Sequence, residues 1–173
     1  MANAFRYNEP GLKTIKYLFK QGITLGNEIN QYECMKRAVC HNSYEMLDLL
    51  FENGLNVNSK HDNINILNHC LCYGGIEFIN YFLDKGVVPC INNLYGVLEI
   101  DNFTLLNLFL EKGLTMNKTE LNYADSEGVV LLRFAKSKEM VKFLVKNGLN
   151  LEIKNCRGQS GKELLTKRLL YPF

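Results

Sequence analysis

Residues Met46–Asn58 read MLDLLFENGLNVN, and the fold prediction starts from this pattern. Apolar residues recur at helical spacing before Gly54, which predicts an amphipathic helix. The glycine stands where many helices end in a left-handed residue. The last four residues predict a short extended segment, so the pattern describes a helix, its stop and the chain that leaves it.

The same pattern occurs five times along the chain. It is repeated as TIKYLFKQGITL around Gly22, FINYFLDKGVVP around Gly86, LLNLFLEKGLTM around Gly113 and MVKFLVKNGLNL around Gly148. With Gly54 included, successive glycines lie 32, 32, 27 and 35 residues apart. A period of about 33 residues is typical of helical repeat proteins, and the chain accommodates about five such repeats.

The composition argues against several classes of protein. Hydrophobic residues make up 47% and charged residues 22% of the chain, as in ordinary globular proteins, so disorder is not expected. The net charge of +2 is too small to indicate binding of nucleic acid or of a membrane surface. No apolar run approaches the length of about 18 residues that a membrane span needs, and the opening MANAFRYNEPG does not resemble a signal peptide. We interpret the six cysteines as reduced, small apolar residues of a cytosolic protein.

A second predicted helix precedes each of the last four glycine-terminated helices. Each of these helices ends in a tight turn made of polar residues or glycines. Each repeat is therefore expected to be a helix-turn-helix unit. With their turns, the four sequences are ECMKRAVCHNS (33–43), NILNHCLCYGG (65–75), NNLYGVLEIDN (92–102) and EGVVLLRFAKS (127–137).

This arrangement resembles ankyrin repeats. Asn155–Ser160 matches the D-x-x-G-x-T segment of that family, and Gly54–Asn58 matches its G-A-D-V-N segment. Small residues that let neighbouring helices approach occur at Ala38-Val39, Cys70-Leu71 and Val97-Leu98. The resemblance implies an all-α, ankyrin-repeat solenoid of about five helix-turn-helix repeats with short or degenerate finger loops.

A single domain, 1–173, is predicted. Its approximate units are 1–32, 33–64, 65–91, 92–126 and 127–159, followed by a C-terminal capping helix at 160–173. A capping box from Ser160 to Glu163 is expected to open that last helix. Residues 1–22 are expected to form a helix pair with its turn at Pro10-Gly11, and Met1 begins either the natural chain or a fragment of a longer protein.

The sequence also departs from the family pattern. No repeat keeps the T-P-L-H segment, so packing is expected to hold neighbouring repeats together more than the hydrogen bonds of that segment do. The short step from Gly86 to Gly113 predicts a shortened finger at Val87–Ile91. The long step to Gly148 predicts an insertion around Met116–Ser126.

The resemblance further implies a concave, protein-binding surface made from finger loops and exposed positions of each first helix. Aromatic and apolar residues at such positions are typical binding hot spots. The alternative is a slipped register, in which residues such as Phe134 and Ile100 belong to the core. The predicted contact residues are Tyr32, His41, His61, Asp62, Tyr73, Glu99, Ile100, Tyr123, Phe134 and Arg157.

A second set of residues is predicted to form the core. These residues lie three or four positions before the glycine stops, on the apolar face of each helix. Truncating any of them is expected to cost about 2–5 kcal/mol of stability. They are Leu50, Phe51, Phe82, Leu83, Phe109, Leu110, Leu144 and Val145.

Residues for catalysis or metal binding are not found in a recognisable pattern. The three histidines fall in different structural roles, and no cysteine or histidine pair has the spacing of a zinc site. RGQSGK lacks the first glycine of a phosphate-binding loop and has Glu163 where that loop needs Ser or Thr. No catalytic set, metal or cofactor is therefore predicted.

Asn58 is a candidate for a modification that the resemblance suggests. Similar ankyrin repeats are substrates for asparaginyl hydroxylation at this position of the turn, and Leu50 lies eight residues upstream as that reaction requires. The simpler interpretation is that Asn58 caps or hydrogen-bonds its own turn.

Three functions remain open. The first is a cytoplasmic, monomeric module that binds a partner protein and catalyses nothing itself. The second is the substrate-recognition domain of a larger effector enzyme, such as an ADP-ribose-transferring effector directed at a host caspase or calmodulin. The Asn-rich, degenerate repeats resemble such host-directed bacterial and viral ankyrin proteins, which would place the chain in the host cytosol. The third is a purely structural scaffold. Neither nucleic acid nor a membrane is an expected partner.

Overall fold

The computed structural model describes residues 8–170, with the side chains of residues 11–166, and it is mostly helical. The chain divides into two compact units, Met1–Val88 (unit 1) and Pro89–Phe173 (unit 2). Within the described part, none of the helices combines the length and apolar character needed to cross a bilayer.

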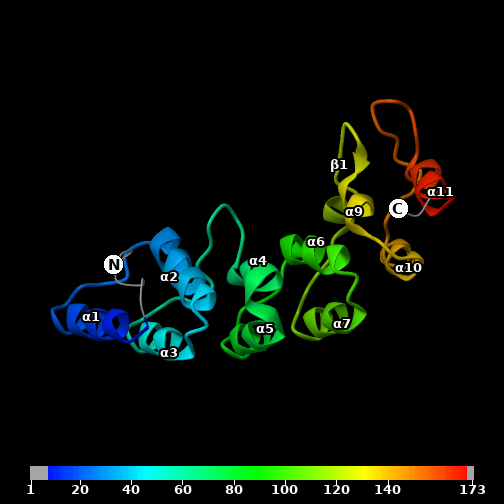
Figure 1. Ribbon diagram of the computed structural model, residues 1–173. Coiled ribbons are helices and arrows are strands. Elements are labelled where there is room, and N and C mark those ends of the chain that lie inside the picture. Colours follow the sequence, from blue (N-terminus) through cyan, green and yellow to red (C-terminus); the bar gives the residue numbers. More distant parts are fainter. Residues whose placement is uncertain (1–7, 171–173) are drawn as a thin grey trace. The chain divides into compact units, whose positions relative to one another are not determined.

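Unit 1 consists of helices joined by short turns and one hairpin loop (Figure 1). Helices α2 and α3 pack side by side as one pair, and α4 with its π-helical continuation packs against α5 as the next. The elements are α1 (Asn8–Lys20), α2 (Glu28–Cys40), α3 (Tyr44–Glu52), α4 (Ile66–His69), the π-helix η2 (Cys70–Gly74) and α5 (Gly75–Asp84).

Unit 2 repeats the helix pair and adds a small two-stranded ribbon. Helix α6 packs against both α7 and α9. The antiparallel ribbon pairs Ala124 with Val129 and Asp125 with Gly128. The elements are α6 (Ile91–Glu99), α7 (Phe103–Glu111), α8 (Lys118–Leu121), β1 (Ala124–Asp125), β2 (Gly128–Val129), α9 (Val130–Phe134), α10 (Lys138–Lys146) and α11 (Gly161–Leu170).

The glycine that follows the long helices stops each of them in the same way. Gly54 has a φ of 84°, which residues with a side chain rarely adopt. This turn lets the next residue, Leu55, donate its N–H to the carbonyl of Leu50 at 3.0 Å. Equivalent bonds follow Gly22, Gly86, Gly113 and Gly148. The predicted glycine stops are thus confirmed, and they satisfy carbonyls that the helix end leaves without a partner.

Polar caps open three of the glycine-terminated helices, whereas α5 has no side-chain cap. The side chains of Ser43, Asn102 and Ser137 each accept a hydrogen bond from a backbone N–H in the first turn of α3, α7 and α10. Helix α11 opens with the predicted capping box: Ser160 Oγ accepts from Glu163 N at 3.3 Å, and Glu163 Oε2 accepts from Ser160 N at 2.9 Å.

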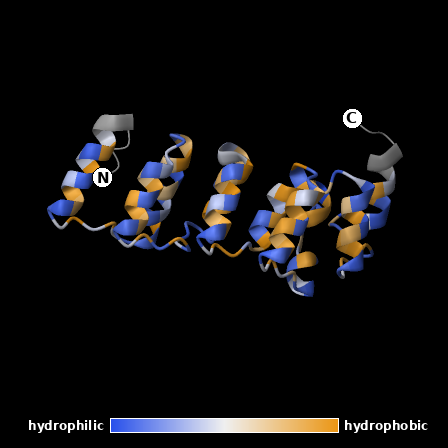
Figure 2. Ribbon diagram, turned by 90° about the horizontal axis from the view of Figure 1, so that it is seen from below, coloured by the Kyte–Doolittle hydropathy of each residue, from blue (hydrophilic) through white to orange (hydrophobic). Residues whose placement is uncertain are grey.

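Four predicted core residues share one repeat position and are fully buried. Each lies four residues before its glycine, and Figure 2 shows the hydrophobic stripes along the helices to which such residues belong. The four residues are Leu50, Phe82, Phe109 and Leu144, each with an exposed fraction of 0%.

The position three residues before the glycine is more variable. Leu83 is buried and Phe51 and Leu110 are half-buried, but Val145 is 41% exposed, so its assignment to the core was wrong. In unit 1 the Phe51 ring contacts Tyr81 of the next glycine-terminated helix. In the described part of the chain, no further glycine-terminated helix follows α10. Val145 therefore has no such helix to cover it.

The loops differ in length as the glycine spacing predicted. Between α3 and α4 the chain forms a hairpin in which His61 and Ile64 exchange both backbone hydrogen bonds. The two central residues, Asp62 and Asn63, both have positive φ, as in the tight turn typical of hairpins. Val87–Cys90, by contrast, contains neither strand nor helix, which confirms the shortened finger. The predicted insertion contains α8 and β1.

Some predicted helix boundaries were wrong. The helix predicted from Glu127 begins at Val130, because Gly128–Val129 form strand β2. Helix α1 is continuous from Asn8 to Lys20, so Pro10-Gly11 lies within a helix and not at a turn between two helices. A proline in the first turn costs little because its missing N–H would have no helical partner there. Helix α2 begins at Glu28, five residues before the predicted Glu33, because Asn27 accepts from the N–H of Asn30 and caps it. The part of the predicted first pair that falls on residues 1–7 lies outside the described residues.

In three helix pairs, a side-chain amide in the first turn of the first helix or before it forms a hydrogen bond with the loop that follows the second helix and its glycine. Gln31 Oε1 accepts from Asn56 N at 2.8 Å, and Asn65 Nδ2 donates to Val88 O at 3.3 Å. In unit 2, Asn122 Oδ1 accepts from Asn150 N at 2.6 Å. All three loop residues lie two positions after a glycine stop. These bonds therefore act within single helix pairs and not between neighbouring pairs.

The amide contact in unit 2 leads to a testable prediction. Asn122 also donates Nδ2 to Gly148 O at 3.0 Å, so Asn122→Ala removes both bonds to the loop. We expect a loss of about 1–2 kcal/mol in the free energy of unfolding, measured by urea denaturation. Asn147→Ala is the control, since its amide donates locally to Phe143 O and the side chain is exposed. Equal losses in the two variants would show that the contact to the loop adds nothing.

Candidate functional site

The structure places most of the predicted contact residues at the surface, but to different degrees. Tyr73 is 74% exposed, Tyr123 62% and Ile100 49%, which is unusual for large apolar side chains. His61 and Phe134 are half-buried, and Tyr32 is buried. The remaining predicted residues are exposed: His41, Asp62, Glu99 and Arg157.

Tyr32 is a core residue, so its prediction as a surface contact was wrong. Only 6% of the residue is exposed, and its ring meets the ring of His61 edge to face at 5.9 Å between centroids. The hairpin between α3 and α4 therefore folds back over α2 and covers Tyr32. Burial, followed by the nearby Glu33 carboxylate, raises the pKa of the Tyr32 hydroxyl.

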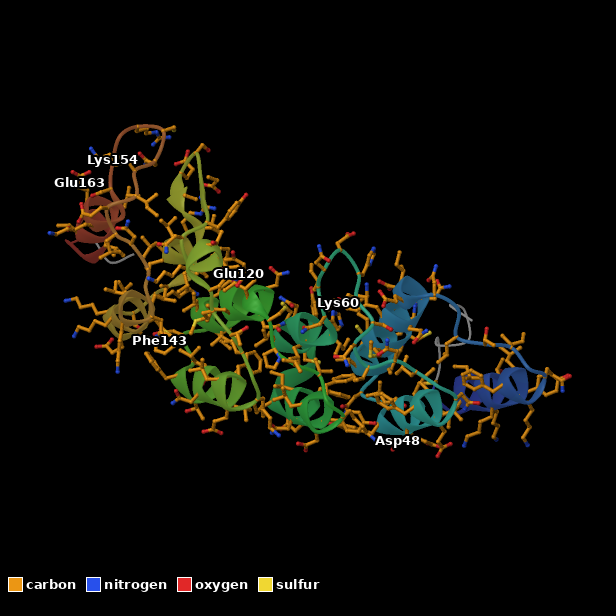
Figure 3. The ribbon with its side chains drawn as sticks, turned by 180° about the vertical axis from the view of Figure 1, so that it is seen from behind. Asp48, Lys60, Glu120, Phe143, Lys154 and Glu163 are labelled. Carbon is orange, nitrogen blue, oxygen red and sulfur yellow. The ribbon has the colours of Figure 1, made fainter. Side chains whose placement is uncertain are left out.

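A charged group lies beside this hairpin in unit 1. Glu33 Oε1 lies 2.7 Å from Lys36 Nζ and 3.6 Å from His61 Nδ1. Partial burial would raise the pKa of the Glu33 carboxyl, but the hydrogen bond and charge of Lys36 outweigh it, so the pKa lies below its ordinary value. Figure 3 shows the hairpin residue Lys60 on the opposite side of unit 1 from Asp48 of α3. The hairpin surface is thus separate from the face where Asp48 accepts a hydrogen bond from Tyr81 at 2.6 Å.

At the other end of α2, a predicted contact residue lies in a group that the sequence did not reveal. The ring of Tyr73 lies 4.8 Å from the ring of His69, and His69 Nε2 lies 3.2 Å from Cys40 Sγ. The π-helix η2 carries Tyr73, and π-helical turns occur frequently at functional sites. His41, the residue after Cys40, is also exposed.

Unit 2 contains an aromatic group formed by Tyr95, Tyr123 and Phe134. The rings of Tyr95 on α6 and Phe134 on α9 lie 5.3 Å apart. Burial, and then the charge of Tyr123, raise the pKa of the Tyr95 hydroxyl. The backbone carbonyl of Tyr123 accepts the N–H of Val130 at 3.0 Å, which ties Tyr123 to the first residue of α9. Phe134 is half-buried by this contact, so it belongs neither to the full core nor to the open surface.

Sequence reasoning did not nominate Tyr95, because the ankyrin pattern assigned it to the His of the T-P-L-H segment. One sequence signal points to it: Tyr95 lies four residues before the predicted contact Glu99, hence on the same face of α6. The structure adds that this tyrosine is only half-buried.

An ion pair borders the aromatic group. Arg133 donates two hydrogen bonds to the carboxylate of Asp125, at 2.7 Å and 2.6 Å. These bonds, together with the N–H of Glu127, lower the pKa of Asp125 to about 2. The carboxylate is therefore charged at physiological pH, and the paired geometry restrains the guanidinium beside the rings. On the same ribbon, Glu127 lies 3.6 Å from Arg157, another predicted contact residue.

Glu99 and Ile100 lie at the C-terminal end of α6. The next residue, Asp101, accepts a hydrogen bond from Ser137 Oγ at 2.6 Å, which connects this turn to the start of α10. Ile100 is thus exposed on an ordered turn and not in the core. The slipped-register alternative does not apply to it.

Asn58 is exposed on the segment after the Gly54 stop. Its backbone N–H donates to the side chain of Asn56 at 3.0 Å, so Asn56 makes the local turn that had been assigned to Asn58. Hydroxylation of Asn58 stays a prediction.

The described residues offer no group of three or more His, Cys, Asp or Glu side chains that could hold a metal ion. All six cysteines are free thiols.

Comparison with protein-family models and with curated proteins finds no match to this chain.

Proposed function

We propose that this chain is a cytoplasmic protein-recognition module of the ankyrin type, which binds a partner protein and catalyses no reaction itself. Support comes from the helix pairs, the glycine stops at a period of about 33 residues and the loops that extend from the helix pairs. Free cysteines suit the reducing cytosol.

The observation that carries the proposal is the aromatic group of unit 2. The ring of Tyr95 on α6 contacts that of Phe134 on α9, Arg133 precedes Phe134 on the same helix, and the carbonyl of Tyr123 accepts the N–H of Val130 at the start of α9. Tyr and Arg are enriched among the residues that contribute most to protein interfaces. Tyr123 is 62% exposed, so a partner has a large apolar area left to bury.

The group is also restrained before a partner arrives. Tyr95 and Phe134 belong to helices that pack against each other, and the two hydrogen bonds that Arg133 donates to Asp125 hold its guanidinium in place. A preorganised surface loses less side-chain entropy on binding, which favours affinity. The exposed Tyr73 of unit 1 is proposed as a second contact.

A matched pair of tyrosines tests the proposal. Tyr17 of α1 is 61% exposed, almost as much as Tyr123, but it lies outside the aromatic group. A photo-reactive phenylalanine analogue is placed at either position in the full chain, and cross-linked proteins from cell cytosol are identified. We expect a discrete partner to be cross-linked from position 123 and not from position 17.

The affinity of that partner then provides the quantitative measurement. Tyr123→Ala is expected to weaken its binding by about tenfold or more, and Tyr17→Ala by less than about twofold. Circular dichroism of both variants controls for loss of fold. A partner bound equally by both variants, or no partner specific to position 123, would contradict the proposed surface.

A further inference from the structure

An exposed thiol is paired with an imidazole in unit 1. Cys40 is the last residue of α2, and His69 is the last residue of α4, 29 positions later in the chain. The packing of these two helices brings Cys40 Sγ within 3.2 Å of His69 Nε2. When the ring proton is on Nδ1, Nε2 is free to accept the thiol proton.

The surroundings of His69 keep its imidazole in the neutral form. The residue is half-buried, and the Tyr73 ring lies against the imidazole at 4.8 Å. Burial, and then the charge of Lys36, lower the pKa of His69 below its ordinary value. The imidazole is therefore mostly neutral at pH 7, so a nitrogen lone pair is available to the thiol proton, while the same shift makes the ring a weaker base. Glu33, which acts in the opposite direction, is the weaker influence.

The other cysteines provide contrasting environments in the same chain. Cys70 is fully buried, and burial raises the pKa of its thiol to about 12. Cys34 is also buried, and burial raises the pKa of its thiol as well. Cys72 and Cys156 are exposed, as Cys40 is. Exposure alone therefore does not distinguish Cys40, whereas the contact with His69 does.

We propose that Cys40 is a site of thiol–disulfide exchange with low-molecular-weight disulfides such as glutathione disulfide, with His69 as the general base. The Cys40 sulfur attacks one sulfur of the disulfide R–S–S–R as its proton passes to His69 Nε2. A new bond forms between Cys40 and one R–S group, and the old S–S bond breaks. The leaving thiolate takes the proton from His69 and departs as R–SH, so the disulfide supplies all the oxidising equivalents.

The test measures how fast each cysteine of the reduced full chain reacts. The protein is mixed at pH 7 with glutathione disulfide, or with an aromatic disulfide reagent that reacts faster. Samples are quenched with acid and alkylating agent, and peptide mass spectrometry gives the rate for each site. We expect Cys40 to react about ten times faster than Cys72 and Cys156, because His69 Nε2 lies 3.2 Å from Cys40 Sγ and can accept its proton as the sulfur attacks.

Two variants test whether the fast reaction of Cys40 depends on its contact with His69. His69→Asn is expected to slow Cys40 to the rate of Cys72 and Cys156. Cys72→Ser removes another exposed thiol and is expected to leave the Cys40 rate unchanged. The buried Cys70 serves as a reporter of folding, because it reacts only if the packing opens.

The measured rates either overturn or support the proposed role of Cys40 and His69. Equal rates for Cys40, Cys72 and Cys156 in the unsubstituted chain would overturn the proposal, as would an unchanged Cys40 rate in a folded His69→Asn protein. If His69→Asn exposes Cys70, the rates in the unsubstituted chain decide by themselves. A selective Cys40 that loses its advantage in the folded variant supports the proposal.

Discussion

Leu144→Ala is expected to lower the free energy of unfolding by about 3 kcal/mol, within the range of about 2–5 kcal/mol for leucines truncated in a core. Leu144 is fully buried on α10. Its backbone carbonyl also accepts the N–H of Leu149, which follows the glycine stop. Removing the side chain leaves a cavity next to this turn, and the surrounding helices close it only partly.

Val145→Ala is the matched control, because it changes the next residue of the same helix. Val145 is 41% exposed, so its truncation removes little buried area. Alanine also has a higher helix propensity than valine, which offsets part of the loss. We expect a change of less than about 0.5 kcal/mol, measured for both variants by urea denaturation monitored by circular dichroism.

The comparison tests the arrangement of repeats in unit 2 as well as one side chain. Comparable losses in the two variants would mean that Val145 is covered, and so that a further element packs on α10. A small loss in Leu144→Ala would mean that the position four residues before the glycine is not the core position of the repeat.

Gly75→Ala is the second substitution for which we expect a large loss, about 2 kcal/mol. Gly75 is the first residue of α5 and directly follows η2, with a φ of 69° and a ψ of −178°. This region of backbone conformation is almost restricted to glycine, so alanine would be strained. The added methyl would also lie 3.1 Å from the Glu77 carboxylate, which is flexible enough to move.

Gly75→Asn tests whether Gly75 has a backbone conformation restricted to glycine or the left-handed helical conformation that asparagine also adopts. Asn42 and Asp101, in the turns before α3 and α7, have φ values of 51° and 53°, which asparagine and aspartate tolerate. The left-handed helical region has a ψ of about +47°, far from that of Gly75. Gly75→Asn is therefore expected to destabilise as much as Gly75→Ala, whereas the exposed Ile76→Ala should cost much less. Rescue by asparagine in thermal or urea unfolding would refute the assigned strain.

Much of the local structure could be predicted from the sequence, because the interactions that determine it lie within a few residues. The stop after Leu50 depends on Gly54, and the start of α11 depends on Ser160 and Glu163. The helix boundaries that were wrong also have local causes. Asn27 caps α2 three residues before Asn30, a local signal that the repeat period does not contain.

The candidate site was less predictable. The exposure of Tyr73, Tyr123 and Ile100 followed from their positions in the repeat. The aromatic partner of Phe134 did not, because Tyr95 lies 39 residues away and had been assigned a structural role. The contact between Cys40 and His69 likewise joins two helices and has no motif of its own.

The repeat period, the helix caps and the glycine stops can be predicted from the sequence, because backbone hydrogen bonding and conformational strain act between residues that are close in the sequence. Burial cannot, because it depends on which element covers a given face. Tyr32 is buried because a hairpin turns back over it, and Val145 is exposed because the described chain has no glycine-terminated helix after α10. Residues at the same position of different repeats can therefore be buried or exposed, and the packing of the helices decides which.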